Sequence, residues 1–286
     1  MFSKCMNKFL ISTLFILFIC SSGKGQSEMI KVNRKAIYKM TFYVDSLNAD
    51  SKREEICELL LGDTVSLFRS ATKARKDSIY KGLTTHNAFK MSAPTIIKMG
   101  EMSPLNYQVL KYDSKNVKVF DEYLGSDLKQ LNVLNYYYEP AGFMDNWKLS
   151  SDTLAIGDLL CQKAEINFGG RYWTAWFCPQ IPISDGPYKF NNLPGLILKI
   201  EDRSKTWCFD FLGLFDREET IVINDKKGLK IEKKEKEKIL KERRYYQKNI
   251  VAIKEASGTD FGNGKKEAQK NVEKYISTDN NWIELK

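Results

Sequence analysis

The stretch Leu159–Pro179, LLCQKAEINFGGRYWTAWFCP, decides the fold class of this chain. Gly169 and Gly170 form a two-residue turn signal between two strand-like runs, a pattern that predicts a β-hairpin. Because side chains alternate between the two faces of a strand, the apolar ones indicate the core face. That face comprises Ala164, Ile166, Trp173, Ala175 and Phe177.

The register of this hairpin follows from its turn. Phe168 faces Arg171, and counting outward places Cys161 opposite Cys178 in a non-hydrogen-bonded pair. The Cα atoms of such a pair lie about 4.5 Å apart. This distance falls inside the disulfide range of about 4.4–6.8 Å, so we predict a Cys161–Cys178 bond, with two free thiols as the alternative.

Strand signals recur along the rest of the chain. They mark Ala36–Val44, the hairpins Ile56–Leu61/Thr64–Arg69 and Asn106–Tyr112/Val117–Tyr123, then Val133–Glu139, Leu196–Ile200 and Asp216–Asn224. Helices are expected at Ala71–Leu83, Ile231–Ile253 and Lys265–Ile276. We therefore predict an α+β, β-rich fold with a curved, mostly antiparallel sheet and a charged helical C-terminal region.

The N-terminal 25 residues have the three parts of a secretory signal. Met1–Lys8 is basic, Phe9–Cys20 is almost wholly apolar, and Ser21–Gly25 is small and polar, which predicts cleavage before Gln26. An uncleaved anchor is the alternative, although the apolar run is shorter than the about 20 residues that span a bilayer. A lipoprotein would use Cys20, but no small residue directly precedes it. Residues 1–25 are thus a predicted signal peptide, 26–225 a β-rich domain and 226–286 a charged helical region.

The net charge of +9 is unevenly distributed. Residues 1–25 hold three lysines and no acid, which leaves +6 on the rest of the chain. Lys226–Lys254 holds 12 Lys/Arg against four Glu, so the remaining residues total −2. This pattern argues against a nucleic-acid surface, which needs aromatics interleaved with the charges. The basic helix 231–253 is either a solvated face or a contact with anionic lipid.

A second stretch, Ile181–Asp202, carries a Pro-Gly turn followed by a strand. Pro194 presets φ and Gly195 supplies a positive φ, which predicts a type II turn. The stretch resembles the GLPGLI family, exported proteins of unknown function from Gram-negative envelopes. The matching residues are Leu193, Pro194, Gly195, Leu196 and Ile197, with Asn192 in place of the first glycine.

The resemblance continues on both sides of this turn. It includes Arg171, Gly186-Pro187, Tyr138-Glu139 followed by Trp147, and the ending Asn281–Leu285. It implies no biochemical activity, and it suggests outer-membrane transport or receptor proteins as partners by association only. Since the motif has no group that titrates near neutrality, we favour a structural role for it over a docking role.

Known catalytic and metal-binding patterns are missing from the sequence. A Ser-His-Asp or Cys-His arrangement would have to use His86, the one histidine. The acid pairs Glu54-Glu55 and Asp121-Glu122 place neighbouring side chains on opposite faces of a strand. The four cysteines after residue 25 (Cys57, Cys161, Cys178 and Cys208) are too scattered for a zinc pattern. We expect no metal and no cofactor.

Two functions remain after these exclusions. The first is a non-enzymatic envelope or periplasmic accessory protein that binds a protein partner or an apolar ligand. The alternative is a hydrolase acting on envelope polymer or peptide, which needs ionisable groups converging in one cleft.

Overall fold

The structure, a computed structural model, describes residues 28–82, 105, 107–113, 116–121, 133–223, 230–256 and 258–285. The predicted signal peptide, His86, Glu122 and the predicted boundary between residues 225 and 226 lie outside the described residues. Within the described ranges, none of the helices combines the length and the apolar character needed to cross a membrane.

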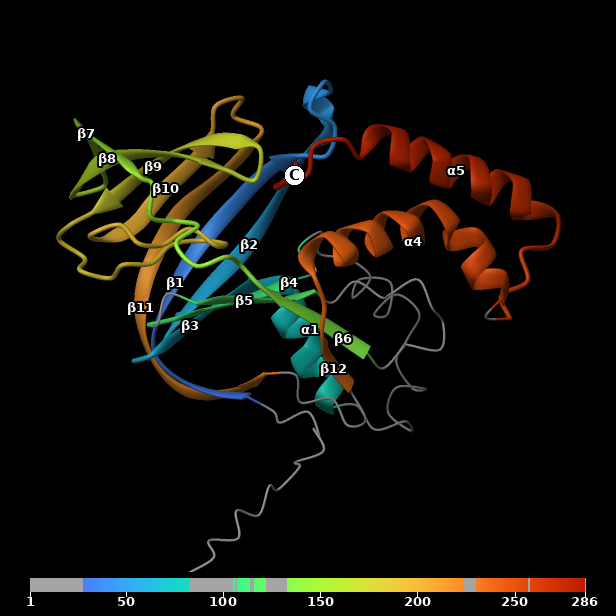
Figure 1. Cartoon of the computed structure of the whole chain (residues 1–286), viewed down its shortest axis with the longest axis horizontal. Helices are drawn as coiled ribbons and strands as arrows, with labels where there is room; N and C mark the ends of the chain where they lie inside the picture. The colour runs from blue at the N-terminus through green and yellow to red at the C-terminus, as the bar shows by residue number, and fades with distance from the viewer. Residues whose placement is uncertain are drawn as a thin grey trace, which may run out of the picture.

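Twelve strands form one sheet in the order β12-β6-β5-β4-β3-β2-β1-β11-β10-β9-β8-β7 (Figure 1). Each described pairing is antiparallel except that of β12 with β6. The predicted β-rich α+β fold is therefore confirmed. The strands are β1 (Glu28–Tyr43), β2 (Lys52–Leu61), β3 (Val65–Ser70), β4 (Tyr107–Tyr112), β5 (Val117–Asp121), β6 (Val133–Tyr138), β7 (Lys148–Ile156), β8 (Leu159–Phe168), β9 (Arg171–Cys178), β10 (Leu196–Asp202), β11 (Trp207–Ile223) and β12 (Lys230–Lys233).

The helices are α1 (Ala71–Gly82), α4 (Lys236–Ala256) and α5 (Lys265–Thr278), with short 3-10 turns η1 (Ala49–Ser51) and η3 (Gly262–Gly264). α4 and α5 lie side by side and extend beyond the sheet (Figure 1). The predicted helix start at Ile231 is wrong, because the residues before α4 add a parallel edge strand to β6. The backbone N–H of Lys234 donates to Tyr136 O at 2.9 Å and closes this pairing.

The long strands β1 and β11 give the sheet its curvature. Register shifts interrupt their pairing between Val32 and Arg34 and between Ile37 and Tyr38. Such bulges bend and twist a strand pair, and Figure 1 shows both strands curving together around the lower end of the sheet. The main core lies on the inner face of the sheet. A second core behind it comprises Ile30, Val32, Leu60, Leu67, Leu110, Phe120, Leu134 and Ile223.

The separate strand expected at Asp216–Asn224 is instead the second half of β11, which runs through Gly213. Gly213 pairs with Ile37, directly beside a register shift. A Cβ at Gly213 would lie 2.8 Å from the Phe215 ring. This glycine therefore marks a bend inside a strand rather than the end of one.

β8 and β9 form the predicted hairpin. Phe168 pairs with Arg171, and the rest of the pairing keeps the predicted register. Gly169 and Gly170 have φ angles of 61° and 78°, which a two-residue hairpin loop with two positive φ angles requires. The five predicted core side chains are at most 3% exposed.

Candidate functional site

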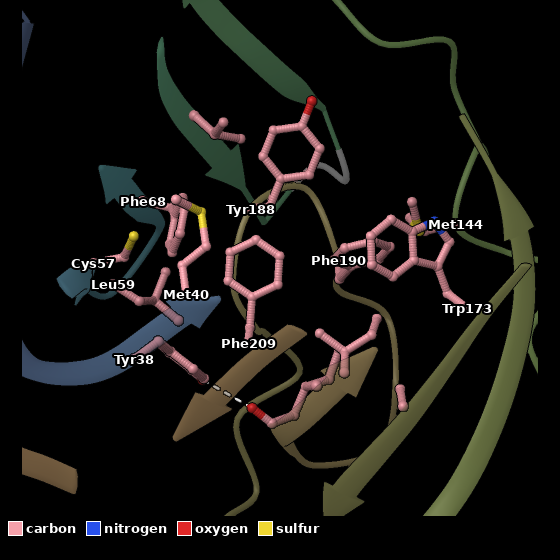
Figure 2. Close-up of a cluster of buried hydrophobic side chains, with 14 of the residues drawn as sticks. Tyr38, Met40, Cys57, Leu59, Phe68, Met144, Trp173, Tyr188, Phe190 and Phe209 are labelled. Carbon is pink, nitrogen blue, oxygen red and sulfur yellow. Dashed lines mark hydrogen bonds between the residues drawn. The ribbon is translucent and has the colours of Figure 1, made fainter. Parts of the chain in front are cut away.

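The connection between β9 and β10 carries most of the family-like motif and packs on the inner face of the sheet. Tyr38 Oη donates to Ile197 O at 2.9 Å at the start of β10. Phe190 is fully buried, and its ring centroid lies 4.8 Å from that of Trp173 (Figure 2). This connection is therefore part of the core rather than a surface loop.

The predicted type II turn at Pro194-Gly195 is wrong. Gly195 does not adopt a positive φ, and its N–H donates to Leu193 O at 2.8 Å, which closes a γ-turn around Pro194. Glycine is required for space instead, since a Cβ at Gly195 would lie 2.2 Å from Cys178 O. This close approach lets the next residue of the chain enter β10 directly opposite Cys178.

The other motif residues also face the interior. A Cβ at Gly186 would lie 2.7 Å from Ile197 Cδ1, so these two segments pack without a gap. Pro194 is exposed. The buried members are Gly186, Pro187, Leu193, Gly195, Leu196 and Ile197. The arrangement leaves the motif little surface for a ligand.

Asn192, which stands in place of the first glycine of the motif, has a backbone conformation that favours glycine. Its φ is 68°, in the left-handed region that glycine adopts most easily and asparagine tolerates. The Asn192 side chain donates to Asp145 Oδ1 at 2.7 Å, which holds the conformation. Asparagine at this position is therefore compatible with the left-handed backbone conformation.

Lys189, within the same connection, lies at the centre of a buried charge cluster. The cluster comprises Lys189, Lys236, Glu139 and Glu284. Lys189 has no exposed side-chain surface, and its Nζ contacts both carboxylates. Lys236 Nζ lies 2.9 Å from Glu139 Oε1 and 2.5 Å from Glu284 Oε2, so two cations balance two anions. Tyr137 Oη accepts a further hydrogen bond from Lys189 at 3.0 Å.

Mutual pairing sets the protonation of this charge cluster. Burial alone would raise the pKa of Glu284, but Lys189 and Lys236 lower it to about 2. Burial would likewise lower the pKa of Lys189, but Glu284 and Glu139 raise it above its ordinary value. Glu284 and Lys189 are therefore both charged at neutral pH, and neither is poised to exchange a proton.

A second buried ion pair holds the start of the motif to β4. Lys111 Nζ lies 2.5 Å from Asp185 Oδ1 and donates to the backbone oxygens of Gly186 and Tyr188. Ser66 Oγ donates to Asp185 from β3. Burial lowers the pKa of Lys111, and the Asp185 carboxylate opposes that shift.

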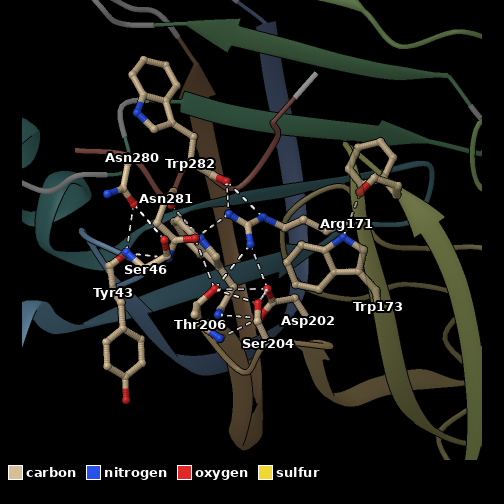
Figure 3. Close-up of polar contacts among 12 residues, drawn as sticks. Tyr43, Ser46, Arg171, Trp173, Asp202, Ser204, Thr206, Asn280, Asn281 and Trp282 are labelled. Carbon is tan, nitrogen blue, oxygen red and sulfur yellow. Dashed lines mark hydrogen bonds and ion pairs between the residues drawn. The ribbon is translucent and has the colours of Figure 1, made fainter. Parts of the chain in front are cut away.

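The C-terminal strap, residues 280–285, is tied across the sheet by Arg171 (Figure 3). Arg171 donates to Asp202 Oδ2 at 2.8 Å, to Asn281 Oδ1 at 2.6 Å and to the backbone oxygen of Trp282. Asn281 Nδ2 donates to Tyr43 O at 2.6 Å. Ile283 is 5% exposed, so the strap also inserts into the core.

Both cysteines of the predicted disulfide are free thiols in the structure. Cys161 and Cys178 are buried, and burial together with the neighbouring Cys178 raises the pKa of Cys161 to about 12. The register that brings them together is confirmed, whereas the bond itself stays a prediction. Cys57 and Cys208 are also free thiols.

The acids considered for catalysis do not converge. Glu54 is exposed beside Lys52, whereas Glu55 is buried and accepts from Ser70 Oγ. Asp121 pairs with Arg243 in the interior. In the described part of the chain, no three His, Cys, Asp or Glu side chains gather as metal ligands would.

The most accessible strand is β7, which the sequence analysis missed. It lies at one end of the sheet, and β8 is its sole strand neighbour within the described ranges. Leu149 and Leu154 on β7 are 56% and 37% exposed, and Leu160 on β8 is 56% exposed. Because β7 is exposed along most of its length, its sequence KLSSDTLAI needs no apolar alternation and gives no strand signal.

Comparison with protein families identifies the same central stretch. A family model described as a protein of unknown function (Porph_ging) matches residues 170–199, from the hairpin turn to β10. This range contains Arg171, Gly186-Pro187 and Leu193–Ile197 of the residues that resemble the GLPGLI family, but not those near residues 138–147 and 281–285. No curated protein matches this chain.

Two solved structures of PNGF-II, in space groups P21 and C2, resemble this chain in fold. Each has a TM-score of 0.50 and 11% sequence identity over 76% of this chain. The matched part is 34% of one PNGF-II chain and 33% of the other, so this chain corresponds to about a third of PNGF-II. At this identity the likeness concerns the fold alone.

Proposed function

We propose that this chain is an exported, non-enzymatic accessory protein of the cell envelope that binds a protein partner through the edge strand β7. It would act in the periplasm or at the outer-membrane periphery. The observation that carries the proposal is the open edge β7 with its exposed leucines. Export rests on the three-part sequence of residues 1–25.

The interior supports binding over hydrolysis. Glu139 and Glu284 are two carboxylates that do converge, as a hydrolase requires. However, their side chains are only 2% and 7% exposed, and Lys189 and Lys236 hold both. Separating a buried pair costs about 3–5 kcal/mol, because it leaves a charge without a partner. We infer that this carboxylate pair stabilises the fold and does not reach a substrate.

The edge strand has the geometry that extended peptides recognise. An open edge presents unpaired backbone N–H and C=O groups, and a peptide binds by adding one more strand. β7 is nine residues long, and after a register shift between Leu149 and Thr153 it pairs regularly with β8 from Thr153 to Ile156. Exposed Leu149 and Leu154 share the face of Ala164 and Cys161, respectively, with which they pair, and would receive apolar side chains of the partner. We expect an extended partner segment with apolar residues at alternate positions.

Site-specific photocrosslinking in the native envelope tests this proposal. A photoreactive residue replaces Leu154 or Leu160 in the full exported chain, and Leu212 serves as the control. Leu212 is 55% exposed on β11, in the middle of the sheet rather than at its edge. We expect one defined protein adduct from the two edge positions and none from Leu212.

A second variant separates this outcome from chance capture. Leu154→Lys with crosslinker at Leu160 should lose the adduct, because a lysine on an edge strand disfavours strand addition. Equal adducts from Leu212, or an adduct that Leu154→Lys leaves intact, would overturn the proposal. A bound envelope glycan or peptide that the protein cleaves would favour the hydrolase instead.

A further inference from the structure

The solvent face of α4 carries a basic stripe. Lys238, Lys241, Arg244 and Lys248 are all exposed, and their spacing of three and four residues aligns them along one side of the helix. Tyr245 lies beside them and is 57% exposed. This stripe is distant in the fold from the β7 edge, since α4 lies near β6 towards the other end of the sheet.

The opposite face of α4 is fixed by packing. Ile239, Tyr246 and Ile253 are buried on that face, and Arg243 pairs with Asp121 of β5. The helix therefore holds its basic stripe outward.

α5 adds more positive charge beside this stripe. Lys266, Lys270 and Lys274 are exposed at intervals of four residues, and Tyr275 is 55% exposed. Across α4 and α5, nine exposed Lys/Arg outnumber three exposed acids. No α5 residue is buried, so packing against the core accounts for little of the surface of this helix.

We propose that the exposed face of α4 and α5 docks on a bilayer that contains anionic lipid. With 21 residues, α4 is about 30 Å long, and its charges are spread along the axis as a flat polyanionic surface requires, rather than gathered around one small anion. Each Lys or Arg near an anionic membrane strengthens binding by about fivefold. Exposed tyrosines suit the headgroup region, where one end of the ring is apolar and the other wet.

Vesicle flotation of the purified exported chain tests this inference. The vesicles contain phosphatidylcholine alone or phosphatidylcholine with phosphatidylglycerol. We expect binding only with phosphatidylglycerol, and its loss at about 1 M salt, where charges are screened over about 3 Å. Replacing Lys238, Lys241, Arg244 and Lys248 by Gln should weaken binding by about 100-fold or more.

The matched control makes the same change in net charge elsewhere. Lys31, Lys52, Lys148 and Lys205 are exposed on other elements, and their replacement by Gln should weaken binding by less than about fivefold. Far-ultraviolet circular dichroism checks that both variants keep the fold. Equal losses in the two variants, equal binding to phosphatidylcholine alone, or no vesicle binding at all would overturn the inference. Because no partner protein is present, none of these outcomes bears on the β7 proposal.

Discussion

The inner face of the sheet and its outer elements are built in opposite ways. On the inner face, Lys189 is fully buried and forms ion pairs with Glu139 and Glu284. Arg171 forms an ion pair with Asp202 and a hydrogen bond with Asn281 of the C-terminal strap. On the outside, β7 and the stripe of α4 leave apolar and basic side chains free for contact. Most of the residues that resemble the family lie in the inner region, whereas Pro194 and Tyr138 are exposed. The resemblance therefore concerns mainly residues that stabilise the fold. The surfaces suited to partners, β7 and the basic stripe of α4, contain none of the residues that carry it.

Removing the buried lysine should have the largest effect on this contrast. Lys189→Met leaves Glu139 and Glu284 with less compensation, and we expect the free energy of unfolding to fall by about 3–5 kcal/mol. Lys199→Met is the matched control, because Lys199 pairs with Glu201 and Asp210 on the outer face. Its cost should stay below about 1 kcal/mol in the same denaturant titration. Equal costs would remove the distinction between the two regions.

Acid should weaken the same charge cluster. The pKa of Glu284 is about 2 in the folded chain, below the ordinary value of 4.5. A depressed folded-state pKa contributes stability above pH 4.5, and that contribution is lost as the pH falls from 4.5 towards 2. The shift corresponds to on the order of 3 kcal/mol. Denaturation measured across this window should show a shallower decline in Lys189→Met, and an identical decline would contradict the assignment to Lys189.

The motif glycine tests the structural role of the γ-turn. Gly195→Ala puts a Cβ against Cys178 O, so the backbone must shift, and we expect a loss of about 2 kcal/mol. Gly264→Ala is a fair comparison, because nothing lies within 4 Å of its Cβ position. The thermal midpoint of Gly264→Ala should change little. A similarly small change for Gly195→Ala would mean that the turn is not constrained by β9.

The Asn281 side chain is one of the groups that fasten the strap. Asn281→Ala removes hydrogen bonds to Arg171 and to Tyr43 O and should cost about 1–2 kcal/mol. The neighbouring Asn280 is exposed and bonds Ser46 and Asp45, so Asn280→Ala should cost less than about 0.5 kcal/mol. Chemical denaturation of the two variants measures the difference, and its absence would mean that the strap is not fastened at Asn281.

The β8–β9 hairpin could be predicted in full because its information is local. The glycine pair sets the loop, and the alternation on each side sets the register and the buried face. The β7 strand could not be predicted, since an exposed edge strand imposes no pattern on its side chains. The Pro194-Gly195 turn was predicted wrongly because its conformation depends on a tertiary contact with the backbone of Cys178. The residues of the turn itself give no sign of that contact.

The charge cluster is harder still to predict from the sequence, because its members are far apart along the chain. Lys189 lies 50 residues from Glu139 and 95 from Glu284 along the chain. Both glutamates belong to stretches that resemble the family, yet nothing in either stretch indicates a buried cation. The one local signal is a lysine between two aromatic residues in a stretch predicted to pack, and a buried lysine requires a counter-charge.

The smallest expected effect on stability is that of a substitution on β7. It tests whether this strand, unlike the inner face of the sheet, is dispensable for folding. Leu154→Lys changes a side chain on β7 that is already 37% exposed, so its free energy of unfolding should stay within about 0.5 kcal/mol of the parent. Leu212→Lys, on an exposed site away from the edge, is the control for the substitution itself. If Leu154→Lys alone lowers stability in a denaturant titration, β7 is part of what holds the sheet together and is not free for a partner. If both variants are as stable as the parent while Leu154→Lys alone loses its crosslinked partner, the edge is separable from the fold, as a binding surface must be.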